Sequence, residues 1–532
     1  MVSAAPASTS QDSLLEALKA HLPAPLLDAV GNMRRQLQAS ESSLALAEMK
    51  IQVLEERLRE QRIEQYGPKS DALPNAQLEL LDLEPGVSSA EVEAEAEREP
   101  LEQIEQQNRK KRRPHPGRQK LPADLPRVER IVACTAEQSV CQRCGNETAV
   151  IGYDASEMLD VEPARYFVQV TKREKRACKR CEDATVATAP IAPRIIEKSL
   201  VSDRIIIDTI LDKYTAHLPL YRQSALLERD CGIGVSRSTM DGWVMRVGEL
   251  LVPVVGAMRE ELLAGSYIQA DETPVDVQMH DNRGKNHQAY LWQYGVPGGS
   301  VVFDFRMGRA REGPKSFLDK FDKLLQTDGY AAYDGVGGRN LVHAACWSHA
   351  RRKFVDAVKL NTKDMAAAGL VMRIDALFAV DARARDEKLD HAQRHQLRKQ
   401  ESAPLLDPLR EELKAARNNS LPASATAKAC NYTLALWTKL TRFLDHPELE
   451  LSNNLAENSM RPIALGRRNW IHLGHKEAGP KVAAILSVIE SCRRLGTNPR
   501  HYLADILPGL ACKSIQSLKQ ITPAQWASIQ TS

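Results

Sequence analysis

The sequence predicts a multidomain α+β protein, and three observations carry that expectation. The chain has 532 residues, more than a single hydrophobic core usually serves, so several domains of about 100 to 200 residues are expected. Its N-terminal part repeats with a period of seven, which is typical of a long helix. Its middle part alternates short strand-like runs with helix-like runs. Helices and strands are therefore expected in separate modules.

Bulk composition argues against membrane and secreted proteins. Apolar residues make up 43% of the chain and charged residues 27%, which is ordinary for a water-soluble protein. We find no run of about 18 apolar residues that could cross a bilayer. The segment from Met1 to Gln11 lacks the basic and apolar regions of a signal peptide. We therefore expect a cytoplasmic protein with no membrane partner.

A heptad repeat occupies the first module, residues 1–66. Its two apolar positions are filled by Val30, Leu37, Leu44, Ile51 and Leu58, and by Leu26, Met33, Ser40, Ala47 and Leu54. A lone amphipathic helix packed on its own domain is the alternative, but a seam sustained over this many heptads favours a coiled coil. The sequence therefore predicts a dimerisation helix that ends at Gly67 and Pro68.

An acidic stretch followed by a basic one fills residues 67–120, although the net charge of the chain is only +3. The segment is rich in Glu, Pro and Arg and has no apolar periodicity, so it cannot bury a core. We expect a disordered, charged linker whose basic run could also touch phosphates. The charged residues are Glu84, Glu91, Glu93, Glu95, Glu97, Glu99, Glu102 and Glu105, then Arg109, Lys110, Lys111, Arg112 and Arg113.

Two C-x-x-C pairs mark a predicted zinc-binding module over residues 121–195. Four thiolates on two turns suit a tetrahedral Zn²⁺ site, which would be structural because no ligand position stays open. The run from Tyr166 to Val170 alternates as a strand of this module would. Four unrelated buried cysteines are the alternative. The pairs are Cys141 with Cys144 and Cys178 with Cys181.

A helical DNA-binding region is expected over residues 196–262. One helix covers Tyr221 to Leu227, a glycine-containing turn follows, and a second helix opens at the cap residue Ser236. The arrangement is typical of a helix-turn-helix, in which Arg237 would contact DNA. An ordinary helical hairpin is the alternative, because the turn is longer than in the strict motif.

Residues 263–360 are predicted to form the first part of a ribonuclease-H-like catalytic domain. Three strand-like runs, a short helix and a fourth strand-like run follow one another: Ser266 to Pro274, Gln288 to Tyr294, Val301 to Phe305, Gly313 to Phe321, and Leu324 to Tyr330. In this fold the first and fourth strands lie side by side. Asp271, at the end of the first strand, and Asp328, on the fourth, would then be neighbours.

A third carboxylate, Glu457, stands on a predicted helix in the second part of that domain, residues 448–532. Three carboxylates can share Mg²⁺ or Mn²⁺, and a pair of such ions activates the attacking oxygen and stabilises the leaving oxygen in phosphodiester chemistry. Arg461, Arg467 and Arg468 are predicted to hold the DNA backbone beside them.

Three other acidic residues compete for the metal role. Asp304 lies in the middle of a strand-like run, and Asp334 lies beyond the fourth one. Glu272 would point to the opposite face of the strand from Asp271. We therefore rank all three below the residues chosen above.

An all-helical insertion is expected over residues 361–447, because the gap between Asp328 and Glu457 is longer than a strand and a helix need. Just before it, Cys346 and His349 have the C-x-x-H spacing of metal ligands. Only two ligands are apparent, so we favour a fold-stabilising or DNA-proximal role over zinc. The basic residues predicted to contact DNA here are Arg351, Arg352 and Lys353.

Several local strings resemble those of the transposases of the IS-sixty-six insertion-sequence family, a group of the DDE type. They run from the heptads to the C-terminal part: Tyr66-Gly67-Pro68-Lys69-Ser70, the paired C-x-x-C motifs, Ala270-Asp271-Glu272-Thr273-Pro274, Thr327-Asp328-Gly329-Tyr330, Cys346-Trp347-Ser348-His349-Ala350-Arg351-Arg352-Lys353-Phe354, Asn453-Asn454-Leu455-Ala456-Glu457 and Gly466-Arg467-Arg468-Asn469-Trp470.

The resemblance implies that Asp271, Asp328 and Glu457 are the catalytic triad. It further implies a nucleoid-associated enzyme that binds the terminal inverted repeats of an insertion sequence, frees 3′ hydroxyls and joins them to target DNA, with possible accessory proteins from the same element. Ser459 and Met460 depart from the residues often found there, which leaves the triad intact. The alternative function is a DNA-binding regulator or scaffold with an inactive nuclease fold.

Overall fold

A computed structural model describes residues 23–66, 146, 166–176, 187–190, 192–279, 285–361 and 363–530. The chain divides into two units, which are described separately: residues 1–102 with 192–532, and residues 103–191. Within the described ranges no helix is both long enough and apolar enough to cross a membrane.

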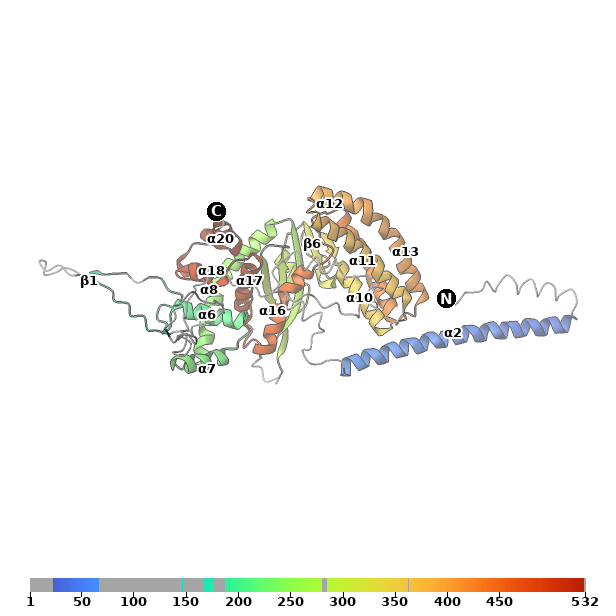
Figure 1. The fold of residues 1–532 in the computed structure, drawn as a ribbon, viewed down its shortest axis with the longest axis horizontal. Helices are drawn as coiled ribbons and strands as arrows, with labels where there is room; N and C mark the ends of the chain where they lie inside the picture. The colour runs from blue at the N-terminus through green and yellow to red at the C-terminus, as the bar shows by residue number, and fades with distance from the viewer. Residues whose placement is uncertain are drawn as a thin grey trace. The chain divides into compact units, whose positions relative to one another are not determined.

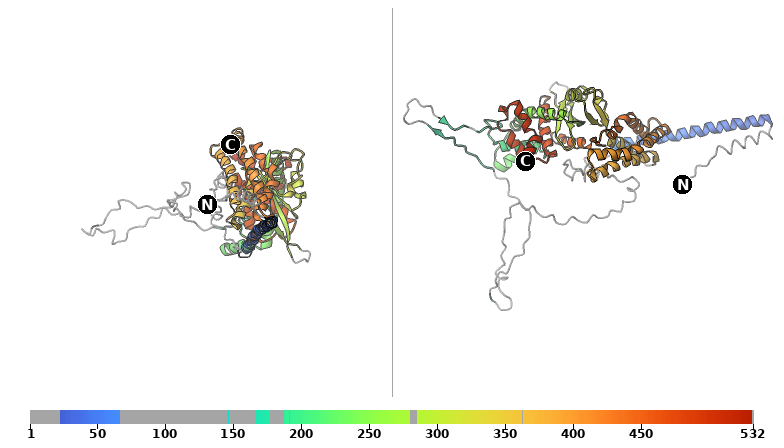
Figure 2. Two further views of the ribbon diagram at one scale, coloured as in Figure 1. Left: turned by 90° about the vertical axis from the view of Figure 1, so that its right-hand side faces the viewer. Right: turned by 90° about the horizontal axis from the view of Figure 1, so that it is seen from above.

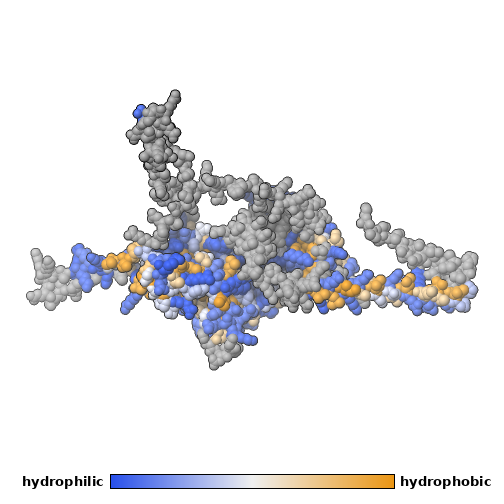
Figure 3. All heavy atoms as spheres, turned by 60° about the horizontal axis from the view of Figure 1, so that its bottom comes forward, coloured by the Kyte–Doolittle hydropathy of each residue, from blue (hydrophilic) through white to orange (hydrophobic). Residues whose placement is uncertain are grey.

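The heptad stretch is a single helix, α2 (Ala24–Tyr66), as predicted. The large apolar residues of its seam are 52% to 69% exposed, and apolar spheres run along the helix in Figure 3. A helix of this length carries its seam as a stripe that a partner helix would cover. The coiled coil itself stays a prediction. The exposed seam residues are Leu26, Met33, Leu37, Leu44, Ile51, Leu54 and Leu58.

The second unit contains a short antiparallel ribbon of β1 (Lys175–Arg176) and β2 (Ala187–Thr188). The run from Tyr166 to Val170 precedes this ribbon and is not a strand, contrary to the prediction. Phe167 and Val168 are both exposed there. Neither side chain of the pair is therefore buried, and apolar alternation alone does not form a strand without a surface to pack on. The four cysteines and the predicted linker lie outside the described residues.

One mixed sheet of five strands forms the centre of the first unit, in the order β5-β4-β3-β6-β7. β4 is antiparallel to both β3 and β5, whereas β6 is parallel to both β3 and β7. The predicted neighbours, the first and fourth strands, do pair, with Tyr267 opposite Leu324. The strands are β3 (Tyr267–Val277), β4 (His287–Gly295), β5 (Val301–Arg306), β6 (Leu324–Thr327) and β7 (Val342–Ala345).

The first strand is longer than predicted. β3 continues six residues beyond Asp271, to Val277, because Thr273, Val275 and Val277 are buried and keep the alternation going past Pro274. Asp271 therefore stands in the middle of a strand and not at its end. Asp328 directly follows the last residue of β6.

One group of helices shares a continuous hydrophobic core with the sheet. α17 is buried along most of its length, from Val482 to Ile489, as expected for a helix that is apolar on most sides. Gly479 allows this close approach, since a Cβ there would lie 2.3 Å from the ring of Phe305 on β5. The group comprises α6 (Asp203–Tyr214), α7 (Leu220–Cys231), α8 (Arg237–Ala264), α9 (Glu312–Leu318), η1 (Ala331–Tyr333), α16 (Asn454–Trp470), α17 (Ala478–Arg494), α18 (Pro499–Ile506), η4 (Leu510–Cys512), α19 (Ile515–Leu518), η5 (Lys519–Ile521) and α20 (Pro523–Gln530).

The predicted helix-turn-helix segment consists of α7 and α8. Gly232, at φ 70°, ends α7 in the left-handed conformation that glycine adopts without strain. Ser236 caps α8 by accepting a hydrogen bond from the backbone N–H of Thr239. α8 then runs for 28 residues and enters the core of the sheet, so it is much longer than the helix that the turn alone predicts.

A second group of helices builds a separate core with Tyr267, Leu324 and the residues of β7. The described residues between 361 and 447 are predominantly helical, as predicted. Figure 1 and the right view of Figure 2 place the sheet between α17 and α18 on one side and α11 and α13 on the other. The elements are α10 (Trp347–Leu360), α11 (Met365–Asp386), α12 (His391–Leu397), η2 (Arg398–Ser402), α13 (Ala403–Asn419), α14 (Ala425–Ala435), α15 (Trp437–Leu440) and η3 (Thr441–Leu444).

A buried ionic network fixes this second group. Asp381 of α11 accepts hydrogen bonds from Arg394 (2.8 Å) and Arg398 (2.6 Å), and Arg394 also binds Glu450. The backbone of Glu450 in turn accepts a hydrogen bond from Gln326 of β6 at 2.6 Å. Helices, sheet and the segment that leads into α16 are thus joined by polar contacts that burial makes costly to break.

We expect Asp381→Ala to lower the free energy of unfolding by about 3 to 5 kcal/mol, because it leaves the buried guanidinium group of Arg398 without a carboxylate and removes one of the two that bind Arg394. Urea denaturation followed by tryptophan fluorescence measures this loss. Glu411→Ala is the matched control, since Glu411 pairs with Lys414 on the surface, where a pair contributes less than about 1 kcal/mol. A loss from Asp381→Ala no larger than that of the control would contradict the account.

Candidate functional site

Asp271 stands where four carboxylates act on one another. Burial raises the pKa of its carboxyl group, and the negative charges of Glu457, Glu272 and Asp328 raise it further, to about 8. A hydrogen bond of 2.9 Å from the backbone N–H of Glu272 to Asp271 Oδ1 partly opposes this shift. Three residues that are far apart in the sequence, Asp271, Asp328 and Glu457, thus lie within electrostatic reach of one another. That they form a catalytic triad stays a prediction.

Asp328 is held by the turn that follows β6. Its Oδ1 accepts a hydrogen bond of 2.8 Å from the backbone N–H of Tyr330, and its carbonyl oxygen accepts one from the hydroxyl of Tyr432 on α14. Gly329 between them has φ 94°, a conformation that other residues rarely adopt. The turn therefore depends on a glycine in the sequence and on a tyrosine 104 residues further along.

Glu457 lies in the first turn of α16, opposite the first turns of α10. Its Oε2 accepts a hydrogen bond from Arg352 Nη2 at 3.2 Å, and its Oε1 lies 3.3 Å from His349 Nε2. That second contact lacks hydrogen-bond geometry, so Oε1 is a buried oxygen without a hydrogen-bond partner among the described residues. Glu457 therefore faces Arg352 with one oxygen and the imidazole of His349 with the other.

The C-x-x-H string joins α10 to the segment before α16. Cys346 is buried, and its Sγ accepts a hydrogen bond of 3.3 Å from the backbone N–H of Asn453. Burial lowers the pKa of His349, but Cys346 and Glu457 outweigh it and raise the pKa to about 9. These contacts tie the C-x-x-H string to the segment before α16. The fold-stabilising or DNA-proximal role that we favoured over zinc stays a prediction.

The chemistry of these donors suits a divalent cation. Mg²⁺ and Mn²⁺ take hard oxygen ligands such as carboxylates, and a cation would relieve the repulsion that raises the pKa of Asp271. Within the described ranges, however, no three Asp, Glu, His or Cys side chains are grouped closely enough to hold a metal ion. The oxygen donors and their negative charge therefore fit a divalent cation. The three side chains, however, lie farther apart than the ligands of a bound ion, and Glu457 faces Arg352.

Glu272, one of the three competitors, is fully engaged elsewhere. Its Oε1 accepts hydrogen bonds from Arg309, and its Oε2 accepts one of 2.9 Å from the hydroxyl of Tyr333. Burial raises the pKa of Glu272, and Arg309 lowers it. We therefore keep Glu272 below Asp271 as a metal ligand.

The other two competitors also have partners of their own. Asp304 accepts a hydrogen bond of 2.7 Å from Arg306 on the same strand. Asp334 is paired with Lys439 and lies 3.6 Å from His343. Neither Asp304 nor Asp334 is among the charges that act on Asp271.

The basic residues of α10 differ in what they can reach. Arg351 is only 5% exposed and donates two hydrogen bonds to Asp375 of α11. We therefore withdraw Arg351 from the predicted DNA contacts, because moving its side chain to DNA would leave the buried carboxylate of Asp375 without its cation. Arg352 and Lys353 are exposed, and Lys353 Nζ lies 4.5 Å from the ring centroid of Tyr432.

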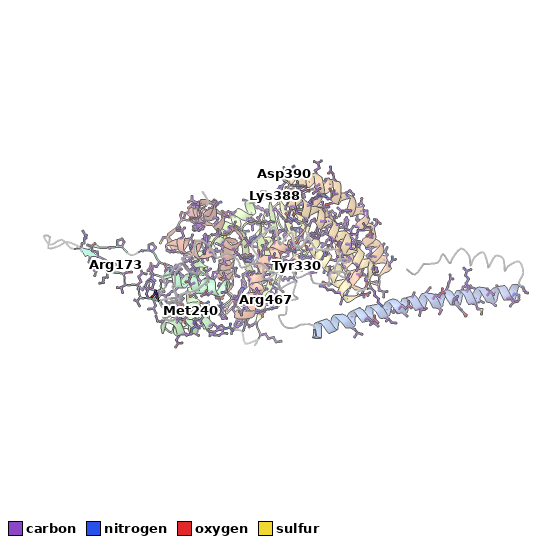
Figure 4. All side chains as sticks on the ribbon, viewed as in Figure 1. Arg173, Met240, Tyr330, Lys388, Asp390 and Arg467 are labelled. Carbon is purple, nitrogen blue, oxygen red and sulfur yellow. The ribbon has the colours of Figure 1, made fainter. Side chains whose placement is uncertain are left out.

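The arginines of α16 and α8 also differ. Arg467, labelled in Figure 4, donates hydrogen bonds to the carbonyl oxygen of Pro274 (2.6 Å) and to Thr273 Oγ1 (3.1 Å). Its guanidinium thus ties α16 to β3, directly beside Asp271. Arg461 is half-buried one turn after Glu457, whereas Arg468 and Arg237 are exposed.

Sequence reasoning missed Arg309 and Tyr432. Arg309 lies in a loop after β5 with no motif around it, and Tyr432 belongs to the helical segment that was expected only to interrupt the domain. Their contacts with Glu272 and Asp328 arise from tertiary packing. No local signal marks either residue, because neither has a spacing or pattern of its own.

Comparison with protein families gives three matches along the chain. The profile described as "Transposase IS66 family" matches residues 198–481. A profile described as "zinc-finger binding domain of transposase IS66" matches residues 138–182, a range that includes all four paired cysteines. A third, described as "Transposase C of IS166 homeodomain", matches residues 53–130.

Curated relatives come from Sinorhizobium fredii, and they are described as uncharacterized. The protein y4jD is 31% identical over 77% of this chain and 82% of its own length. The protein y4hP is 28% identical over 90% and 88%, and y4qI is 31% identical over 75% and 75%. The similarity thus extends over most of each protein.

The raised pKa of Asp271 predicts a stability effect in the metal-free protein. A carboxyl group with a folded-state pKa above its unfolded value stabilises the fold when protonated, and this stability is lost as the pH rises from about 4 to 8. Asp271→Asn should therefore increase the free energy of unfolding by about 1 to 3 kcal/mol at pH 8 and by less at pH 5.

Thermal unfolding in the presence of a chelator measures this difference at the two pH values. Asp276→Asn on the same strand is the control, because Asp276 is exposed and its substitution should change the unfolding temperature little. An Asp271→Asn protein that is no more stable than the wild type at pH 8 would show that the carboxylates do not strain the site.

Proposed function

The chain belongs to the IS66 family of transposases, and we propose that it is a DDE-type enzyme whose Asp271, Asp328 and Glu457 catalyse the cutting and joining of DNA. The observation that carries the proposal is the pairing of β3, which holds Asp271, with β6, which Asp328 directly follows. It is supported by the pKa of the Asp271 carboxyl group, which burial and the charges of Glu457 and Asp328 raise. Perturbed carboxylates gathered at one place are typical of catalytic sites. The family match supplies the substrate class, DNA.

The sheet is assigned in this proposal to a ribonuclease-H-like fold. The strand order, with β3 antiparallel to β4 and parallel to β6, supports the assignment. The helices α11 to α15 would be an insertion between α10 and α16 that splits the catalytic domain into residues 263–360 and 448–532. In this proposal the insertion stabilises the segment that leads to Glu457, because the buried network links Asp381 in the insertion to Glu450 in that segment through Arg394.

The proposed reaction is hydrolysis of a phosphodiester at each end of an insertion sequence, followed by attack of the freed 3′ hydroxyl on target DNA. Two Mg²⁺ ions, or Mn²⁺, when held by Asp271, Asp328 and Glu457, supply activation of the attacking oxygen and stabilisation of the leaving oxygen. Asp271 lies on β3, where its backbone is opposite Gln293 of β4, and Asp328 directly follows the neighbouring strand β6. Glu457, on a helix end, is the carboxylate whose position can change.

The residues around the triad would bind the DNA backbone. Arg352 and Lys353 on α10 and Arg468 on α16 are exposed cations that can contact phosphates. Arg352 would exchange Glu457 for a phosphate when DNA is bound. Arg461 stands one turn beyond Glu457, and we keep it in the proposed DNA-binding set. Arg467 we assign to holding α16 against β3, because its bonds to Pro274 and Thr273 occupy it.

The remaining modules would recognise the ends of the element. We propose that α7 and α8 read the terminal inverted repeats through Arg237 and its neighbours, and that Cys141, Cys144, Cys178 and Cys181 hold a structural Zn²⁺. Their spacing and the zinc-finger match support that ligand set. An enzyme that cuts and joins chromosomal DNA would be associated with the nucleoid, and accessory proteins of the same element would be its further partners.

A DNA-binding regulator or scaffold with an inactive nuclease fold is the second candidate. The observation that favours it is that no three potential ligands within the described ranges stand at metal-binding distance. Metal-dependent release of a 3′ hydroxyl from a labelled end fragment separates the two, because a scaffold would bind the fragment without cutting it.

We expect Asp271→Ala, Asp328→Ala and Glu457→Ala each to reduce strand cleavage by at least about a thousandfold, while binding to the element's ends is retained. Cleavage of a labelled end fragment in Mg²⁺ and a gel-shift assay measure the two properties. Asp276→Ala is the matched control, an exposed carboxylate on the same strand as Asp271. Persistent cleavage by any one of the three variants would remove that residue from the triad.

The exposed seam of α2 predicts a homodimer. A double substitution, Leu37→Glu with Leu44→Glu, places charges at two apolar heptad positions and should abolish dimerisation. Ser42→Glu, on the outer face of the same helix, should leave it intact. Analytical ultracentrifugation distinguishes the two species. A dimer that persists in the double variant would assign assembly to another part of the chain.

A further inference from the structure

A fourth carboxylate stands beside the proposed triad. Glu272 follows Asp271 on β3, and its side chain is only 2% exposed. Arg309 donates to Glu272 Oε1 through Nε at 3.0 Å and Nη2 at 2.6 Å, while the hydroxyl of Tyr333 donates to Oε2. Both oxygens of this carboxylate are therefore bound, and its charge faces a guanidinium.

Arg309 is itself held in place by the turn that anchors Asp328. The guanidinium carbon lies 4.0 Å from the ring centroid of Tyr330, and the hydroxyl of Tyr330 donates a hydrogen bond of 3.1 Å to the carbonyl oxygen of Arg309. The backbone N–H of the same tyrosine binds Asp328 Oδ1. Tyr330, labelled beside the sheet in Figure 4, thus connects Arg309 to one member of the triad.

An unpaired Glu272 would be a competing ligand. Its side chain leaves β3 on the opposite face from Asp271, but it is a hard oxygen donor, its charge acts on Asp271, and the charge of Asp328 acts on it. Divalent cations of this class accept any carboxylate that can reach them. Productive positioning needs a defined ligand set, because displacement by about 1 Å can reduce a rate about a hundredfold.

We propose that Arg309 is a positioning residue that keeps Glu272 out of the metal-binding set and so leaves the divalent ions to Asp271, Asp328 and Glu457. The inference rests on the proposed function, because it concerns the same site. Arg309 acts through Glu272 and Tyr330 and does not itself touch the reacting atoms.

The test uses the full-length protein and four sequences: the wild type, Arg309→Met, Glu272→Gln and the double variant. Methionine keeps an apolar stem against Tyr330 without the charge, and glutamine keeps the shape of Glu272 without its charge. Binding of Mn²⁺ is measured by the electron paramagnetic resonance of the free ion. Cleavage of an end fragment and the unfolding temperature are measured in parallel, and Asp271→Ala provides the control for metal bound at the site.

Arg309→Met should bind Mn²⁺ about three- to tenfold more tightly, because a nearby positive charge is lost and a carboxylate is released. Its cleavage rate should nevertheless fall about tenfold or more. The double variant should return both values to within about threefold of Glu272→Gln. This opposite movement of affinity and rate is not what a merely structural role would produce.

Three results would overturn the inference. Arg309→Met could bind and cleave like the wild type, or it could lose Mn²⁺ affinity together with its unfolding temperature without rescue by Glu272→Gln. The double variant could also stay as impaired as Arg309→Met, which would assign Arg309 to DNA contact. If instead the wild type shows neither Mn²⁺-dependent cleavage nor Mn²⁺ binding that depends on Asp271, the proposed function fails as well, which distinguishes the two failures.

Discussion

The burial of carboxylates that also repel one another is the physical constraint on which the site of this structure depends. The backbone of Asp271 is held by the pairing of β3 with β4, opposite Gln293, and burial together with Glu457, Glu272 and Asp328 raises the pKa of its carboxyl group. A fold that only needed stability would place apolar side chains there. The chain keeps the charges together and compensates for them with specific neighbours.

Those neighbours divide the acidic side chains by role. Arg309 pairs with Glu272 and Tyr333 donates a hydrogen bond to it, whereas Glu457 faces Arg352 with one oxygen and His349 with the other. Contacts farther from the site also hold these side chains in place. The network of Asp381, Arg394 and Glu450 ties the second helical group to the segment before α16, and Arg467 ties α16 to β3. Glu457 is therefore supported from two directions.

Local patterns predicted most of the fold, because each was reinforced by its surroundings. The heptads predicted α2, and the alternating runs predicted the strands of the sheet. Gly232 and the cap residue Ser236 predicted the boundary between α7 and α8. The prediction was wrong for residues 166–170, where the described segment buries neither Phe167 nor Val168. It also stopped β3 at Asp271, since an acidic residue followed by Pro274 looks like a strand end.

The site was predictable in its acidic members and not in what surrounds them. Short motifs marked Asp271, Asp328 and Glu457, whereas the partners of the site come from distant segments with no pattern of their own. Arg351 shows the reverse error. A basic triplet on a helix suggested DNA contacts for all three residues, but helical periodicity turns Arg351 inward to Asp375 and leaves Arg352 and Lys353 outside.

The most direct test is a structure of the full chain bound to an end fragment and Mn²⁺, with anomalous scattering to locate the metal. We expect two manganese peaks about 3.5 to 4 Å apart, ligated by Asp271, Asp328 and a Glu457 that has released Arg352. An absence of manganese between these carboxylates in the DNA-bound protein, or manganese held by other residues, would contradict the catalytic assignment.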